Sequence, residues 1–109
     1  MAPTIARFQV RLVVLNPARG AEMRKSRPAL VISPNEMNRH LSTLIIAPMT
    51  TTLRAWPFRV DVAFDGKRGQ VALDQLRSID KSRCQQYLGD LPITLQSTVT
   101  QRLQAMFSA

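Results

Sequence analysis

The sequence predicts a mainly β fold, a small antiparallel barrel with one helix at its C-terminal end. Two observations lead to this class. Short apolar and β-branched runs alternate with turns rich in Gly, Pro and Asn, and a helical repeat of apolar residues appears only after Pro92. Short strands followed by a closing helix are typical of such a barrel. The 109 residues, 45% of them apolar, are expected to form one domain, residues 1–109, around a modest core.

The first half of the chain contains three predicted strands. Residues 8–15 are rich in Val and Leu and end at an Asn-Pro turn, whereas residues 28–32 stop at Ser-Pro-Asn. Residues 44–48 form a third, largely buried strand, and the polar stretch 36–40 between them fits either a helical turn or a loop. Residues 49–57, with three consecutive threonines and a tryptophan, are expected to form a loop.

The second half continues with shorter strands. Residues 58–64 alternate apolar and polar side chains, the period of a half-buried strand. Residues 65–69 are the expected hairpin connection, and residues 70–73 return as the next strand. Residues 77–80 and 83–88 have the composition of short, weaker strands.

One amphipathic helix is expected over residues 94–107. Its apolar residues recur at helical spacing on one face, and glutamines and threonines occupy the other. Thr94 is the expected N-cap after Pro92. The apolar face consists of Leu95, Val99, Leu103, Met106 and Phe107.

The charge balance predicts a polyanionic partner. Fifteen Lys and Arg against seven Asp and Glu give a net charge of +8, which suits nucleic acid, an anionic membrane or an acidic protein. A membrane is the least favoured of these, because no basic amphipathic helix appears. The remaining alternative is a basic domain without such a partner.

Composition also limits the chemistry and the compartment. The chain lacks both an apolar run of about 20 residues and the apolar stretch of a secretion signal, so a cytoplasmic protein is expected. A single cysteine, Cys84, excludes an internal disulfide, and a single histidine, His40, gives no metal cluster. We therefore expect no metal and no other cofactor.

Three groups of residues are candidates for function. The loop after residue 15 carries one acid, Glu22, among four cations, Arg19, Arg24, Lys25 and Arg27. Cations stabilise phosphate charge and a carboxylate can move a proton, so this loop suits a phosphate-bearing substrate. The other groups are Thr50-Thr51-Thr52 and Asp74-Gln75-Leu76-Arg77. All three lie at strand ends, where a barrel can bring them to one rim.

Each group also has an ordinary structural explanation. Glu22 and Arg27 can form an exposed ion pair, threonines are common at strand ends, and Asp74 with Gln75 can close a turn. Cys84 fits a core thiol better than a nucleophile, since no partner base is recognisable. Trp56 and Phe58 suit base stacking and core packing equally.

The order of these groups resembles the MazF/PemK family of toxins from bacterial toxin–antitoxin pairs. The resemblance runs from about Arg7 through the C-terminal helix. The residues that carry it are Asn16-Pro17, Gly20, Glu22, Arg27-Pro28 and Val31-Ile32-Ser33-Pro34, then Ile46-Ala47-Pro48-Met49-Thr50-Thr51, then Trp56-Pro57-Phe58, then Gly69 and Val71–Asp80.

The resemblance implies an SH3-like barrel of the CcdB/MazF kind that forms homodimers. It also implies a metal-independent, ribosome-independent endoribonuclease that cuts single-stranded RNA at short sequences, inhibits translation and growth, and is inhibited by a cognate antitoxin. Two alternatives stay open: a non-enzymatic gyrase poison of the same fold, and a degenerate member that only binds RNA or antitoxin.

Carried over by position, the resemblance implies catalytic roles for Arg27, Thr50 and Glu22. Asp74 matches an aspartate with a proposed catalytic role in the PemK branch, but Ala72 stands near the position of the arginine that accompanies it there. The first strand also departs from the family pattern, with Phe8-Gln9-Val10-Arg11.

The expected reaction is attack of the RNA 2′-hydroxyl on the adjacent phosphate, giving 2′,3′-cyclic phosphate and 5′-hydroxyl ends. Glu22 is the expected base, Arg27 clamps the phosphate and Thr50 donates a hydrogen bond to it. The general acid stays open between Arg27, water and another group. The expected RNA-binding residues are Arg24, Lys25, Thr51, Thr52, Arg54, Asp74, Gln75 and Arg77.

Overall fold

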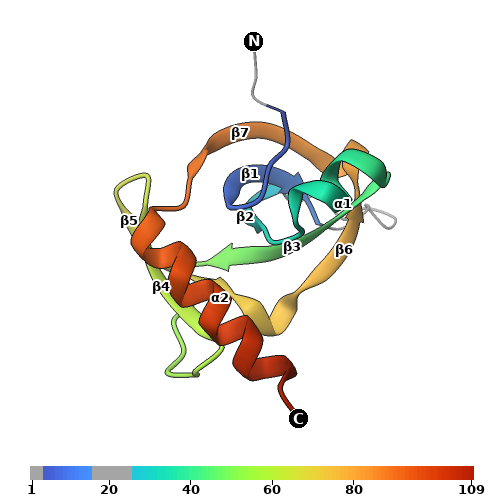
Figure 1. Cartoon of the computed structure of the whole chain (residues 1–109). Coiled ribbons are helices and arrows are strands. Elements are labelled where there is room, and N and C mark those ends of the chain that lie inside the picture. The colour runs from blue at the N-terminus through green and yellow to red at the C-terminus, as the bar shows by residue number, and fades with distance from the viewer. Residues whose placement is uncertain (1–3, 16–25) are drawn as a thin grey trace, which may run out of the picture.

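The computed structural model describes residues 4–15 and 26–109. Within them, seven strands form one antiparallel sheet that curls around the molecule, with helix α2 along one side (Figure 1). The strands are β1 (Gln9–Val14), β2 (Ser26–Val31), β3 (Thr43–Thr50), β4 (Arg59–Phe64), β5 (Lys67–Ala72), β6 (Arg77–Asp80) and β7 (Cys84–Asp90). The helices are α1 (Asn35–His40), α2 (Ile93–Phe107) and the 3₁₀ turns Leu73–Gln75 and Lys81–Arg83.

Strand β3 is the centre of this sheet. One of its edges pairs with β2, while the other pairs with β6 along its first half and with β5 only at Met49 and Thr50. The strand order is therefore β4-β5-β3-β2-β1-β7, with β6 attached to β3. The β1–β7 ladder has two register shifts, which increase local twist and help the sheet to curl. The predicted mainly β class with a C-terminal helix is confirmed.

The two faces of the curled sheet build separate apolar clusters. The first lies under α2, where buried Val99 and the half-buried Leu95, Leu103 and Met106 pack against the sheet. The second lies on the opposite face, because side chains alternate along each strand. Its buried members are Val13, Leu15, Ala29, Val31, Leu44, Ile46 and Ile79.

Several predicted boundaries are wrong, and pairing partners explain them. Met49 and Thr50 belong to β3 rather than to the following loop, because they pair with Val71 and Gln70 of β5. The hairpin connection is only Asp65–Gly66, whose φ values of 53° and 72° fit the tight turns that join paired strands. Residues 67–69, expected in that connection, therefore extend β5.

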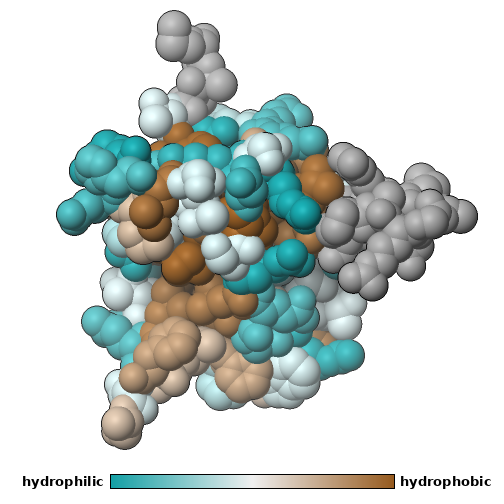
Figure 2. Space-filling model, turned by 90° about the vertical axis from the view of Figure 1, so that its right-hand side faces the viewer, coloured by the Kyte–Doolittle hydropathy of each residue, from teal (hydrophilic) through white to brown (hydrophobic). Residues whose placement is uncertain are grey.

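The C-terminal helix also differs in detail. It begins at Ile93 with Pro92 as N-cap, so Thr94 is inside the first turn and is not the cap. Phe107, expected on the buried face, is 74% exposed. Figure 2 shows apolar colour extending from the middle of one face toward the C-terminal end of the chain. Neither α1 nor α2 has the length and apolarity needed to cross a membrane, and no other helix of the described ranges does.

Candidate functional site

The candidate site is built on a row of side chains that crosses four strands on one face of the sheet. Thr50 of β3 pairs with Gln70 of β5, and Gln70 pairs with Asp61 of β4. On the other side, Ala29 of β2 pairs with Pro48, so the same register continued by two residues places Arg27 opposite Thr50. Paired residues share a face, and the row therefore carries a guanidinium, a hydroxyl, an amide and a carboxylate.

A polar cleft of about 370 Å³ lies at the end of this row that carries Arg27 and Thr50. It brings together four of the predicted site residues, which come from three separate segments. Arg27 and Arg77 give it two cations, and the backbone beneath it is that of β2, β3 and β5. A cleft with paired cations and uncharged donors suits a phosphate group. The lining residues are Leu15, Arg27, Pro48, Thr50, Ala72, Gln75 and Arg77.

The Thr50 hydroxyl has a defined orientation. Its Oγ1 accepts a hydrogen bond of 3.0 Å from the backbone N–H of Thr52. A hydroxyl has one proton and two acceptor positions, so this bond leaves the O–H proton available to another acceptor. Thr50 lies at the last position of β3 and is half-buried. Thr50 thus lines the cleft with a hydroxyl whose proton is available for donation.

Gln70 holds the loop of residues 51–57 beside Thr50. Its Oε1 accepts from the Arg54 N–H at 3.0 Å, and its Nε2 donates to the Arg54 carbonyl at 3.0 Å and to Asp61 Oδ1 at 2.8 Å. Gln70 is buried, and such bonds to a buried amide are costly to break. Thr51, Thr52 and Arg54, the predicted RNA contacts of this loop, are exposed next to the cleft but do not line it.

Arg59 is the residue that the sequence reasoning missed. Its Nε donates to Asp74 Oδ1 at 2.6 Å and its Nη2 to Oδ2 at 3.4 Å, while Nη1 donates to the Thr52 carbonyl at 3.2 Å. Arg59 pairs directly with Ala72 across the β4–β5 ladder. An arginine from the neighbouring strand therefore accompanies Asp74, although position 72 is alanine. The alternation of residues 58–64 was the available signal, since it places Arg59 and Asp61 on one face.

The aromatic residues near this pair surround Arg59. Its guanidinium carbon lies 4.9 Å from the Trp56 ring centroid, and Trp56 packs against Phe58 with 5.5 Å between centroids. Trp56 remains 43% exposed. Phe58 packs against the first apolar cluster, which agrees with the core-packing expectation, whereas Trp56 has an exposed ring whose stacking on bases stays a prediction.

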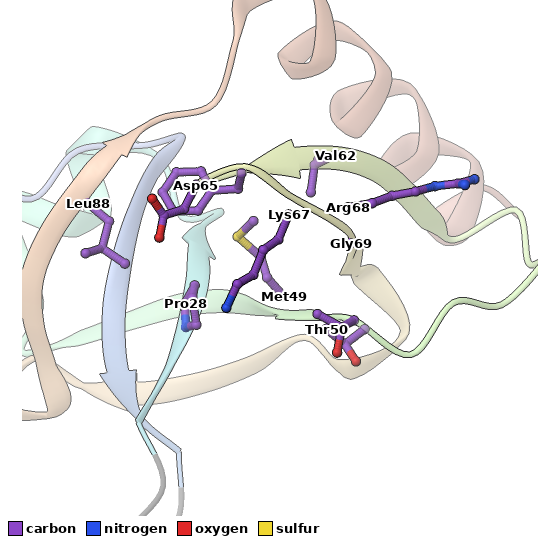
Figure 3. A pocket seen from close by; sticks show the side chains of 11 residues that line it. Pro28, Met49, Thr50, Val62, Asp65, Lys67, Arg68, Gly69 and Leu88 are labelled. Atoms are coloured by element: carbon purple, nitrogen blue, oxygen red, sulfur yellow. The ribbon is translucent and has the colours of Figure 1, made fainter.

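A second cavity, of about 460 Å³, lies on the other face of the sheet and also reaches Thr50. Its walls include Pro28, Met49, Val62 and Leu88, so it is largely apolar. Figure 3 shows Lys67 directed into this space toward Pro28, whereas Arg68 points away from it. Arg27 and Pro28 are adjacent in β2 but line different cavities, because successive strand residues face opposite sides.

The remaining predictions fall outside this geometry. Glu22, Arg24 and Lys25 lie outside the described residues. Asp74 is in the 3₁₀ turn that also carries Gln75, and it contacts Arg59 instead of lining the cleft. Cys84 is half-buried, and burial raises the pKa of its thiol although Arg11 opposes the effect. His40 ends α1 and is exposed. In the parts of the chain with assigned positions, no three His, Cys, Asp or Glu gather as metal ligands.

The chain is similar to known proteins over nearly its whole length. Residues 6–107 match the family described as PemK-like, MazF-like toxin of type II toxin–antitoxin system. The chain is 32% identical over 108 residues to endoribonuclease PemK of Escherichia coli, covering 94% of this chain and 81% of the relative. It is 30% identical over 106 residues to endoribonuclease EndoA of Bacillus subtilis, covering 92% and 91%.

Solved structures agree with the sequence relatives. A MazE–MazF crystal structure from Deinococcus radiodurans superimposes with a TM-score of 0.80 at 27% identity, covering 95% of this chain and 96% of that one. A mycobacterial endoribonuclease in complex with its cognate antitoxin gives a TM-score of 0.78 at 25% identity, covering 93% and 92%.

Proposed function

Because the chain belongs to the PemK-like, MazF-like toxin family of type II toxin–antitoxin systems, we propose that it is a toxin that cleaves single-stranded RNA in the cytoplasm without a metal ion. The observation that carries this proposal is the polar cleft that Arg27 of β2 and Thr50 of β3 both line. Arg27 supplies a permanent positive charge and Thr50 a neutral donor, the two kinds of group that a phosphate in transfer needs.

The proposed reaction is an internal transfer within the RNA. Glu22 takes the proton of the 2′-hydroxyl, the 2′-oxygen forms a bond to the adjacent phosphorus, and the bond from phosphorus to the 5′-oxygen breaks. Arg27 and Thr50 stabilise the charge that develops on the non-bridging oxygens. The leaving 5′-oxygen takes up a proton from a water molecule in the open cleft, and the hydroxide that this forms takes the proton held by Glu22, which returns the carboxylate to its starting state. The products are 2′,3′-cyclic phosphate and 5′-hydroxyl ends.

The exposed residues around the cleft suit the rest of the RNA strand. Arg77 and Arg54 contact backbone phosphates, while Gln75, Thr51 and Thr52 present amide and hydroxyl groups to base edges. Arg24 and Lys25, which lie outside the described residues, are proposed as further phosphate contacts because of their charge. Both oxygens of the Asp74 carboxylate accept hydrogen bonds from Arg59, so Asp74 holds the arginine in place and has only its remaining lone pairs for a contact with RNA.

The proposed partners follow from the relatives and from charge. The neighbours from Deinococcus radiodurans and from Mycobacterial species are complexes with MazE or a cognate antitoxin. With a net charge of +8, this chain suits an antitoxin with an acidic segment that folds on binding and covers the same groove as RNA. Because antitoxin and RNA would share this groove, they should compete, and simultaneous tight binding would contradict a shared groove. We also propose that the protein is a homodimer.

The test is cleavage of a single-stranded RNA by the purified protein in EDTA. Arg27→Ala and Thr50→Val should each lower the cleavage rate by about 10²–10³-fold with little change in thermal stability. Arg39→Ala is the matched control, because Arg39 is exposed on α1 and does not line the cleft. Wild-type cleavage that needs a divalent metal, or full activity in either cleft variant, would refute the proposal.

A further inference from the structure

Arg59 connects two parts of the candidate site that are far apart in the sequence. Its guanidinium binds Asp74 through two parallel N–H groups and binds the Thr52 carbonyl through a third. The Arg59 side chain is only 6% exposed and that of Asp74 is 23% exposed, so this ion pair is largely shielded from water. Shielding strengthens the interaction and makes its geometry exacting.

The bond to Thr52 bears directly on Thr50. The carbonyl of Thr52 accepts from Arg59, and the N–H of the same residue donates to Thr50 Oγ1. Fixing Thr52 at one end therefore fixes the donor that orients the Thr50 hydroxyl. That N–H keeps the hydroxyl proton away from its own side of the oxygen, so without it the proton can also turn toward Thr52 and away from the cleft.

The bond to Asp74 bears on the other wall of the cleft. Asp74 is the middle residue of the 3₁₀ turn Leu73–Gln75, and Gln75 lines the cleft with Thr50. The same guanidinium thus holds the Thr50 loop and the Gln75 turn at one relative position. A planar fork can make these three bonds together, whereas a lysine ammonium cannot match the two carboxylate oxygens in the same way.

We propose that Arg59 is a positioning residue of the ribonuclease site, which sets the orientation of the Thr50 hydroxyl through Thr52 and the place of Gln75 through Asp74. This inference rests on the proposed function. It assigns no contact between Arg59 and RNA, because the side chain is buried and three of its five N–H groups already donate to Asp74 and Thr52.

The first measurement is independent of activity. Amide hydrogen exchange of Thr52, followed by NMR, should accelerate by about tenfold or more in Arg59→Lys, while amides of β1 and β2 keep their wild-type exchange rates. Arg102→Lys is the matched control, because Arg102 of α2 donates to the Pro57 carbonyl at the far end of the same loop. An unchanged Thr52 rate in Arg59→Lys, or the same acceleration in Arg102→Lys, overturns the proposal.

The second measurement is a double-mutant cycle on RNA cleavage. Arg59→Lys should lower kcat by about tenfold with KM changed by less than about threefold. In a Thr50→Val background the same change should have little further effect on kcat, since no hydroxyl remains to be oriented. Equal effects of Arg59→Lys in both backgrounds would show a merely structural role and overturn the inference. Wild-type protein that does not cleave RNA would instead refute the proposed function, and the exchange measurement would still decide the role of Arg59.

Discussion

Gly69 of β5 lies against the backbone of Thr50, and a Cβ atom at position 69 would stand 2.8 Å from the Thr50 carbonyl oxygen. Real Cβ atoms do not approach a backbone oxygen this closely. The absence of a side chain at residue 69 therefore lets β5 pair with the end of β3, and this pairing holds Thr50 in the row that contains Gln70.

Gly69→Ala should consequently move the last residue of β3. We expect a decrease of about 1–3 kcal/mol in the free energy of unfolding, because the added methyl group meets backbone, which cannot rotate away. RNA cleavage should fall as well, since the Thr50 hydroxyl shifts. Urea unfolding and initial cleavage rates measure the two effects. Gly66→Asn is the control: Gly66 has φ 72°, which asparagine tolerates, and its Cβ position is open. Wild-type stability in Gly69→Ala would contradict the close approach.

Salt dependence should separate phosphate contacts from base contacts. Each phosphate neutralised on a single strand contributes about −0.7 to the slope of log K against log salt. Arg77→Ala should therefore reduce the magnitude of the slope by about this amount and lower the affinity for all RNA sequences by a similar factor. Gln75→Ala should leave the slope unchanged and reduce discrimination between sequences. The slopes come from fluorescence titrations of 2′-deoxy-substituted oligonucleotides at several salt concentrations between about 50 and 300 mM, where screening of exposed charges increases strongly. An unchanged slope in Arg77→Ala would remove Arg77 from the RNA path.

Asp80 should make stability depend on pH in the acid range. Its Oδ1 accepts from the Ser82 N–H at 2.9 Å, and this backbone hydrogen bond lowers the pKa of the carboxyl below its ordinary value of 3.8. A lowered folded-state pKa means that the contribution to stability is present above pH 3.8 and is lost as pH falls through the folded-state value. Asp80→Asn should thus be less stable than wild type at pH 7, with the difference shrinking toward pH 2. Urea midpoints at several pH values check this, and a constant difference would contradict it.

The Cys84 thiol should react slowly with thiol reagents, and RNA cleavage should not require it. Burial raises the pKa of this thiol above its ordinary value of 9.0, so the reactive thiolate is scarcer near neutral pH than in an unfolded chain. Labelling with a disulfide reagent at pH 7.5 should be at least about tenfold slower in the folded protein than in urea. Cys84→Ser should keep its RNA-cleaving rate. Rapid labelling of the folded protein together with loss of activity would reverse this assignment.

Much of the fold follows from local patterns. The alternation over residues 58–64 predicts β4 within one residue, and the helical spacing after Pro92 predicts α2 within one residue of its start. The order of short motifs also predicts Arg27, Thr50, Gln75 and Arg77 as site residues, and the structure places these four in one cleft. These features could be predicted because each depends on neighbours within a few positions of the chain.

The pairing between strands could not be predicted in this way. Met49 and Thr50 look like loop residues locally, and only β5 makes them the end of a strand. Asp74 has no arginine two positions before it, and Arg59 reaches it from 15 residues away because β4 and β5 lie side by side. Cross-strand register depends on the sum of many long-range contacts, which no single segment encodes.

The sequence by itself determined the class of the fold, the positive charge and the presence of residue types that can bind a phosphate group. Only the tertiary structure decided how these residues are held: Gly69 lets β5 approach Thr50, Gln70 and Arg59 fix the loop after it, and Arg59 joins that loop to Asp74. The physical reason is that composition and periodicity act along the chain, whereas hydrogen bonds and ion pairs in a shielded site depend on distances between segments that folding alone brings together.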